Sequence, residues 1–212
     1  MNRTGKQVDF LSDDDLAAYS SGDKLASAYD LVVFPGHAEY VTEHAYDVVQ
    51  RYRDLGGNLM FLAANNFFWK ARRDGRLLTK VQIWRKLGRP EAALVGVQFV
   101  AGDSGVRQGG YIVRGAASAP WVFAGTGLSD GDRFGNYGIE IDARAASSPA
   151  GTQLLAEIPN LIGPGSTAEM TYYETPHGAK VFAAGTLNFA ASIDDPPAEQ
   201  LVENVWARLS RP

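Results

Sequence analysis

The chain has 212 residues, of which 45% are hydrophobic and 21% charged, the balance of an ordinary soluble globular protein. Its 20 basic and 24 acidic side chains give a net charge of −4, and the absence of a basic run argues against a nucleic-acid partner. With no cysteine it has no disulfide, thiolate metal ligand or cysteine nucleophile, and its apolar runs are too short to span a membrane. Since the N-terminus has no apolar leader, we expect a cytoplasmic protein.

Two short elements are predicted at the start of the chain. Residues 6–11 (KQVDFL) have the composition of a short strand. The next segment, SDDDLAAY at residues 12–19, predicts a brief helix because Ser12 and Asp15 have the spacing of a capping box.

A strand–helix–strand pattern follows. Continuous apolar runs at residues 29–35 and 58–63 predict strands buried on both faces. Between them, residues 41–55 place apolar side chains on one stripe, as in a helix packed on a sheet, and Gly56 and Gly57 end this helix. Two apolar strands joined by a helix form a right-handed βαβ unit, so we expect the core of the sheet to be parallel.

The rest of the chain is predicted to be rich in strands before it closes with a helix, in which Asp195 is the cap and Pro196 lies in the first turn. Since no boundary divides the chain, residues 1–212 are expected to form one domain. The elements predict a three-layer α/β sandwich with a mostly parallel sheet and an inserted antiparallel region. The strand-like segments in this part are TKVQIWRKL, AALVGVQFV, GGYIVRG, NYGIEIDA and the pair AEMTYYET and GAKVFAAGTLNF, joined by a turn at PHG.

Polar side chains follow the ends of the two predicted parallel strands. In open parallel sheets, ligands bind beyond the carboxyl ends of the strands. His37, Glu39 and Tyr40 follow the first strand, and Asn65 and Asn66 follow the second. Together they supply the groups that metal binding or acid–base chemistry needs. The alternative is structural, because a carboxylate near a helix start is favourable through the helix dipole alone.

Other polar residues are open to both kinds of interpretation. Glu174 ends a strand beside a turn and is placed to reach the same crevice. Arg85 and Lys86 could meet an anion or a carbonyl, although an exposed basic edge is the better explanation of them on its own. Glu140 and Asp142 alternate with apolar residues in GIEID, so we expect them on the solvent face of a strand.

Several motifs, taken together, resemble a known family. They are VVFPGHAEYVT, GGNLMFLAANNFFW, WRKLGRPEAALVGVQF, GIEID and AEMTYYETPHGAKVFAAGT, in this order along the chain. They resemble the C-terminal region of the large (beta) subunit of N,N-dimethylformamidase. The resemblance implies a fold like the class I glutamine amidotransferases, flavodoxin-like, and metal-assisted hydrolysis of a linear amide. Without a cysteine, the thiol-based glutaminase chemistry of the amidotransferases is excluded.

The resemblance also implies roles for individual residues. Glu39 would bind a single iron ion, with His37 beside it in the site. Asn65 would orient substrate or water. Glu174 would be a candidate acid or base, and Lys86 matches a basic position of the family.

The implied iron would polarise the amide carbonyl and lower the pKa of a bound water. Its tyrosine ligands are expected upstream of the region that this chain represents, since Tyr29 and Tyr40 do not match their positions. Two functions follow. One is a hydrolase domain for a small amide substrate, alone as a homo-oligomer or with a partner domain or subunit. The other is a non-catalytic binding or assembly domain, in which the aromatic residues 67–69 either dock a partner or fill the core.

Overall fold

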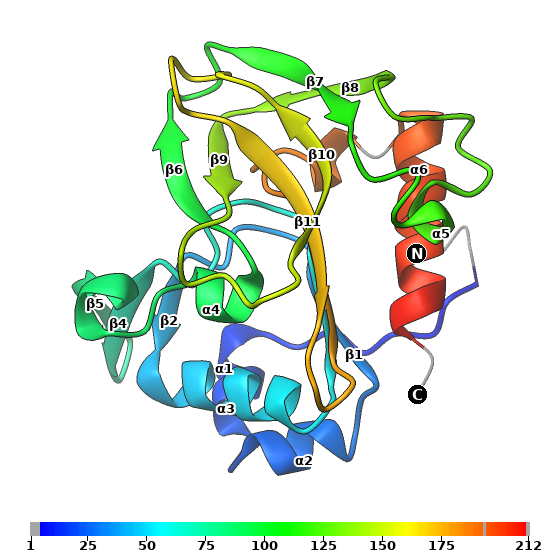
Figure 1. Cartoon of the computed structure of the whole chain (residues 1–212). Helices are drawn as coiled ribbons and strands as arrows, with labels where there is room; N and C mark the ends of the chain where they lie inside the picture. The colour runs from blue at the N-terminus through cyan, green and yellow to red at the C-terminus, as the bar shows by residue number, and fades with distance from the viewer. Residues whose placement is uncertain (1–4, 193, 211–212) are drawn as a thin grey trace.

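The structure is a computed structural model that describes residues 5–192 and 194–210 (Figure 1). Helices and strands alternate in the first half, and strands dominate the second half. The helices are α1 (Asp13–Ala18), α2 (Gly22–Ala26), α3 (Glu43–Asp54), α4 (Ala92–Val95), α5 (Pro120–Phe123), α6 (Pro196–Leu209) and the 3-10 helices η2 (Trp84–Leu87) and η3 (Ala190–Ser192). The strands are β1 (Leu31–Phe34), β2 (Tyr40–Thr42), β3 (Asn58–Phe61), β4 (Trp69–Asp74), β5 (Leu77–Ile83), β6 (Gln98–Gly102), β7 (Gln108–Val113), β8 (Arg133–Gly138), β9 (Glu140–Ala143), β10 (Gln153–Ile158), β11 (Ala168–Glu174) and β12 (Lys180–Ala183).

The predicted strand–helix–strand unit is present. Strands β1 and β3 pair in parallel, with Leu31 opposite Asn58, and α3 connects them. Helix α3 begins where the Oγ1 atom of Thr42 accepts a hydrogen bond from the Ala45 N–H at 3.3 Å. Strand β3 is buried along its whole length, as expected, but β1 is only half-buried because it is the edge strand of the sheet.

The main sheet corrects the predicted fold class. Its strand order is β1-β3-β12-β11-β10-β7-β8, and only the β1–β3 and β3–β12 pairs are parallel. The other four pairs are antiparallel, and the sheet curls (Figure 1), so the expectation of a mostly parallel three-layer sandwich was wrong. The physical reason is the connections: β11 reaches β12 through a short turn, and a short turn can only join antiparallel neighbours.

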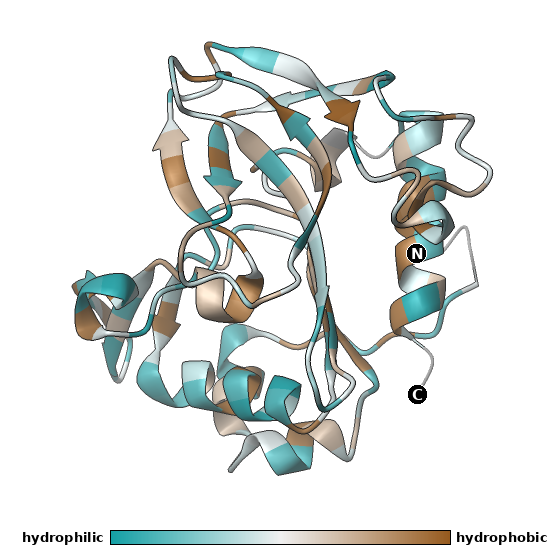
Figure 2. Cartoon of the chain, viewed as in Figure 1, coloured by the Kyte–Doolittle hydropathy of each residue, from teal (hydrophilic) through white to brown (hydrophobic). Residues whose placement is uncertain are grey.

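The two faces of the sheet belong to different hydrophobic clusters. In β3, Leu59 and Phe61 pack with α1, α2 and α3, whereas Met60 between them packs with α5 and α6. The same alternation separates Val181 from Phe182 in β12. Figure 2 shows both apolar and hydrophilic segments along α6. Its buried residues recur every three or four positions, as expected for a helix with one face on a sheet; they are Ala198, Leu201, Val202, Val205 and Leu209.

Local patterns were confirmed in some segments and wrong in others. The capping box of α1 and the β11–β12 hairpin form as predicted. Residues 6–11 form no strand. Residues 84–87 and 92–95, predicted within strands, form η2 and α4.

Two small sheets complete the structure and position the site. One consists of β2, β4 and β5, and its β4–β5 hairpin projects from the body (Figure 1). The other pairs β6 with β9, and a bridge between Ile141 and Thr186 ties β9 to the segment after β12. Strand β9 therefore lies beside the segment that follows β12, and β12 is a parallel neighbour of β3.

Candidate functional site

The loops after β1 and β3 are tied together by Asn66. Its Oδ1 atom accepts a hydrogen bond from the Ala38 N–H at 3.1 Å, and its Nδ2 atom donates to the Ala63 carbonyl at 2.6 Å. The Phe67 N–H adds a bond to the Ala38 carbonyl at 2.8 Å. These contacts make the two polar loops neighbours, as the βαβ unit predicted.

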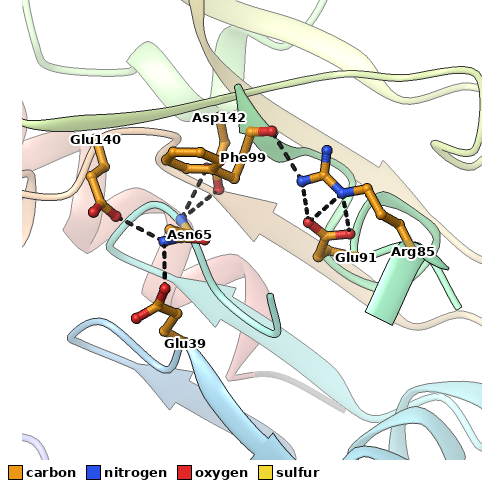
Figure 3. A network of polar contacts seen from close by, with 7 residues as sticks. All are labelled: Glu39, Asn65, Arg85, Glu91, Phe99, Glu140 and Asp142. Atoms are coloured by element: carbon orange, nitrogen blue, oxygen red, sulfur yellow. Dashed lines mark hydrogen bonds and ion pairs between the residues drawn. The ribbon is translucent and has the colours of Figure 1, made fainter. Parts of the chain in front are cut away.

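A cluster of four polar side chains centres on Asn65, and Figure 3 draws three of them, Glu39, Asn65 and Glu140. The Asn65 Nδ2 atom donates to Glu140 Oε2 at 2.9 Å and lies 3.3 Å from Glu39 Oε1. The His37 Nε2 atom is 3.4 Å from Glu140 Oε2 and 3.9 Å from Glu39 Oε2. The side chains of His37, Glu39 and Glu140 are 32%, 15% and 28% exposed, so solvent reaches all three. We call these four residues the Asn65 cluster.

The backbone of Asn65 is held from the other side by Asp142. The Asn65 N–H donates to both carboxylate oxygens of Asp142, at 2.9 and 3.0 Å. Asp142 is 1% exposed, and this burial raises the pKa of its carboxyl to about 7. The expectation that Glu140 and Asp142 face solvent was therefore wrong for Asp142, and both residues contact Asn65 from β9.

A buried ion pair lies next to this network (Figure 3). The Arg85 Nε atom donates to Glu91 Oε1 at 3.1 Å, and its Nη2 atom donates to the Phe99 carbonyl at 3.0 Å. Glu91 is 1% exposed, so Arg85 balances an otherwise isolated buried charge. Arg85 is thus a structural residue rather than part of an exposed basic edge, whereas Lys86 is exposed on η2.

Glu174 does not lie in the Asn65 cluster. It ends β11 opposite Lys180, whose N–H donates to Asn58 Oδ1 at 2.8 Å at the start of β3. Asn65 follows the other end of β3, so the antiparallel direction of β11 carries Glu174 away from the crevice. Its carboxylate accepts a hydrogen bond from the Tyr172 hydroxyl, which lowers its pKa, and another from Arg208 at 3.3 Å.

The described side chains do not form a complete iron site. Within residues 5–192 and 194–210, no group of three or more His, Asp and Glu side chains could hold a metal ion. The phenol of Tyr40 hydrogen-bonds Glu39, which raises the pKa of Tyr40 and opposes phenolate formation. The Tyr29 hydroxyl donates a hydrogen bond to Asp9 Oδ2 instead, at 3.0 Å. The residues in these ranges therefore do not, by themselves, fit the iron centre that the resemblance implies.

The role of β9 was missed from the sequence. A period of two correctly placed Glu140 and Asp142 on one face of a strand, but it does not reveal what that face contacts. The one available signal was the occurrence of GIEID among the motifs that carry the family resemblance.

Comparison with protein families relates the chain to a described group. The family described as N,N-dimethylformamidase beta subunit-like, C-terminal, matches residues 1–203. The chain belongs to this family. The resemblance inferred from the motifs is thereby confirmed, and the dimethylformamidase-like domain is related to part of an amide-hydrolysing enzyme. A search of curated proteins gave no match. Among the helices in the described ranges, none is both long and apolar enough to cross a membrane.

The buried carboxyl of Asp142 predicts a pH dependence of stability in this dimethylformamidase-like domain. Its pKa is about 7 in the folded chain and 3.8 without the protein environment. Between pH 3.8 and pH 7 the folded state keeps a proton that the unfolded state has released. The stabilisation of the folded state by this proton is therefore complete below pH 3.8 and is lost as the pH rises through 7. We expect the free energy of unfolding to fall by up to about 1.4 kcal/mol per pH unit from this group.

Urea denaturation between about pH 4 and pH 8 measures this slope. Asp142→Asn is expected to remove it, because the amide does not titrate. Asp130→Asn is the matched control, since Asp130 also accepts backbone N–H groups but is exposed. Equal slopes in the parent and in Asp142→Asn would contradict the prediction.

Proposed function

We propose that this domain supplies acid–base groups to a hydrolytic site for small linear amides. The observation that supports the proposal is that two carboxylates meet at the amide of Asn65, with the imidazole of His37 3.4 Å from one of them, Glu140. Groups of these kinds transfer protons in amide hydrolysis, and the cluster lies at the carboxyl ends of β1 and β3, where ligands bind in such sheets. Membership of the dimethylformamidase-like family supports the substrate class.

In the proposed reaction, the carboxylate of Glu140 accepts a proton from a water molecule that attacks the amide carbonyl carbon. His37 gives a proton to the nitrogen as the C–N bond breaks, and the products are a carboxylic acid and an amine. The proton held by Glu140 then passes to His37, 3.4 Å away, which restores both groups. Asn65 keeps Glu39 and Glu140 apart by donating to both of them. Proton transfer of this kind contributes about 10²–10⁴-fold in rate.

We propose that Glu39 is a metal ligand only together with ligands from outside this chain. Its carboxylate is partly exposed and meets a nitrogen of His37 at 3.9 Å, but the described side chains offer no complete ligand group. Iron bound there would polarise the amide carbonyl.

The test compares the parent with Glu39→Gln in the longest reading frame that contains this chain. We expect the parent to hydrolyse simple formamides and Glu39→Gln to lose at least about 10²-fold in kcat/KM, since the amide neither accepts a proton nor binds a hard metal ion well. Elemental analysis of both proteins shows whether Glu39 affects iron content.

Glu43→Gln is the matched control, because Glu43 lies four residues away, is exposed and pairs with Lys70 at 2.8 Å. Full activity in Glu39→Gln would refute the site assignment. A parent without hydrolysis would refute the proposed activity.

A second candidate function is assembly with another polypeptide, and the β4–β5 hairpin favours it. Its Leu77, Leu78 and Val81 are 64%, 52% and 49% exposed on the edge strand β5. Leu77 and Leu78 also line a cavity of about 210 Å³ between the hairpin and α1. The hairpin has an excess of basic residues on a chain of net charge −4, so the partner we propose is the acidic surface of another copy of this chain. The basic residues of the hairpin are Lys70, Arg72, Arg73, Arg76 and Lys80; Lys70 pairs with Glu43 and Arg73 with Asp14.

Of the aromatic residues suggested for docking by the sequence, Trp69 belongs to the hairpin as the first residue of β4, whereas Phe67 and Phe68 precede it. Phe67 is fully buried, and Phe68 packs on Phe99 with ring centroids 5.3 Å apart. If the hairpin mediates assembly, the double change Leu77→Ser and Leu78→Ser is expected to reduce the oligomer size in sedimentation at moderate salt. Identical sedimentation of parent and variant would count against assembly through the hairpin.

A further inference from the structure

Asp142 lies behind the Asn65 cluster, and Figure 3 shows Asn65 between Asp142 and Glu39. Both oxygens of the Asp142 carboxylate accept the Asn65 N–H. Asp142 itself is fixed in the fold, because its own N–H donates to the Gly185 carbonyl at 3.0 Å and its strand pairs with β6. A carboxylate held this rigidly can act as an anchor for the loop that carries Asn65.

Asn65 has an uncommon backbone conformation that its contacts hold in place. Its φ angle of 55° lies in the left-handed region, which asparagine tolerates better than other non-glycine residues but adopts mainly in fixed turns. Its Oδ1 atom is buried without a hydrogen-bond partner, which costs free energy that other contacts of Asn65 must offset. The backbone bond to Asp142 and the side-chain bonds to Glu39 and Glu140 are the contacts that do so.

Strand β9 therefore forms hydrogen bonds with Asn65 at two points. Glu140 and Asp142 are two residues apart and lie on the same face of the strand. Glu140 contacts the side-chain amide, while Asp142 contacts the backbone N–H. A shift of the backbone would move the amide that keeps the Glu39 and Glu140 carboxylates apart.

We propose that Asp142 is a positioning residue, which fixes the backbone of Asn65 and thereby the spacing of the Glu39 and Glu140 carboxylates. The anchor itself follows from the geometry, whereas its effect on catalysis rests on the proposed function.

The charge of this anchor depends on its surroundings. Burial is the main cause that raises the pKa of Asp142, and the carboxylates of Glu91 and Glu140 act in the same direction. The Asn65 N–H and the guanidinium of Arg85 act against it. The phenol of Tyr111 also faces Asp142, from β7. Since the pKa is about 7, the anchor changes from a neutral acid to a carboxylate across neutral pH.

The direct test is hydrogen exchange at the Asn65 N–H, followed by NMR in the full chain. Asp142→Ala is expected to speed this exchange at least about tenfold, because the N–H loses its acceptor. Asp142→Asn keeps an oxygen acceptor, so exchange should stay within about threefold of the parent, but the chemical shift of the Asn65 amide should no longer titrate near neutral pH. Glu91→Gln is the control for the exchange rate alone, because Glu91 is an equally buried carboxylate that bonds to Arg85 instead of Asn65; its charge also acts on Asp142, so it is not a control for the titration.

Unchanged exchange in Asp142→Ala would overturn the proposal. If Asp142→Ala does not fold, Asp142→Asn decides, and a parent-like titration of the Asn65 amide in that variant would overturn the proposal.

In a hydrolytically active parent, Asp142→Ala should lower kcat about tenfold or more with little change in KM, and Asp142→Asn should restore most of the loss at a pH below 7. Parent-level kcat in Asp142→Ala would exclude the effect on catalysis, while an inactive parent would count only against the proposed function.

Discussion

Glu140→Gln is expected to lower kcat/KM for amide hydrolysis by about 10²-fold or more, whereas Glu174→Gln is expected to leave it within about twofold of the parent. Glu140 accepts a hydrogen bond from Asn65 and lies 3.4 Å from His37, so it is the carboxylate best placed to exchange protons with water in the cluster. Glu174 contacts Tyr172 and Arg208 near the start of β3. The Glu174→Gln substitution should therefore weaken only these surface contacts with Tyr172 and Arg208.

The measurement is steady-state hydrolysis of a formamide by the three proteins, with unfolding curves to show that each is folded. His44→Ala is a further control, because the ring of His44 meets the Tyr19 carbonyl at 2.8 Å, away from Asn65. A large loss in Glu174→Gln with none in Glu140→Gln would favour the sequence assignment over the geometry. Equal losses in both would indicate that neither carboxylate acts directly.

Phe67→Ala is expected to lower the free energy of unfolding by about 3–5 kcal/mol. The Phe67 side chain is fully buried, and its ring packs edge-on against Phe34, Phe61 and Tyr46 at centroid distances of 5.5, 6.0 and 5.4 Å. Removing the ring leaves a cavity between α3 and the sheet, which these neighbours cannot all fill. Urea denaturation monitored by tryptophan fluorescence gives the change in unfolding free energy.

Phe10→Ala is the matched control, because Phe10 is 86% exposed and its loss should cost no more than about 0.5 kcal/mol. A loss below about 1 kcal/mol in Phe67→Ala would mean that the ring is not part of the core, given the usual cost of such cavities. The aromatic run after Asn66 would then again be a candidate for docking a partner.

Short-range patterns accounted for the features that depend on neighbouring residues. The stripe of α3, the buried strand β3, the capping box of α1 and the hairpin at residues 175–179 all follow from periodicity and turn chemistry over a few residues. The same reasoning brought His37, Glu39 and Asn65 together, because the ends of two parallel strands joined by one helix must be neighbours.

Long-range pairing decided the rest. The direction of β11 carries Glu174 away from the site, and the pairing of β9 with β6 brings Glu140 and Asp142 to Asn65. A polar–apolar alternation says that two carboxylates share a face, but not whether that face meets water or a buried loop. By itself the sequence determined the βαβ unit, the absence of thiol chemistry and three of the four residues of the Asn65 cluster. Only the tertiary structure decided the antiparallel, curled sheet and the place of Glu140 in the cluster, because strand order arises from contacts between segments far apart in the chain.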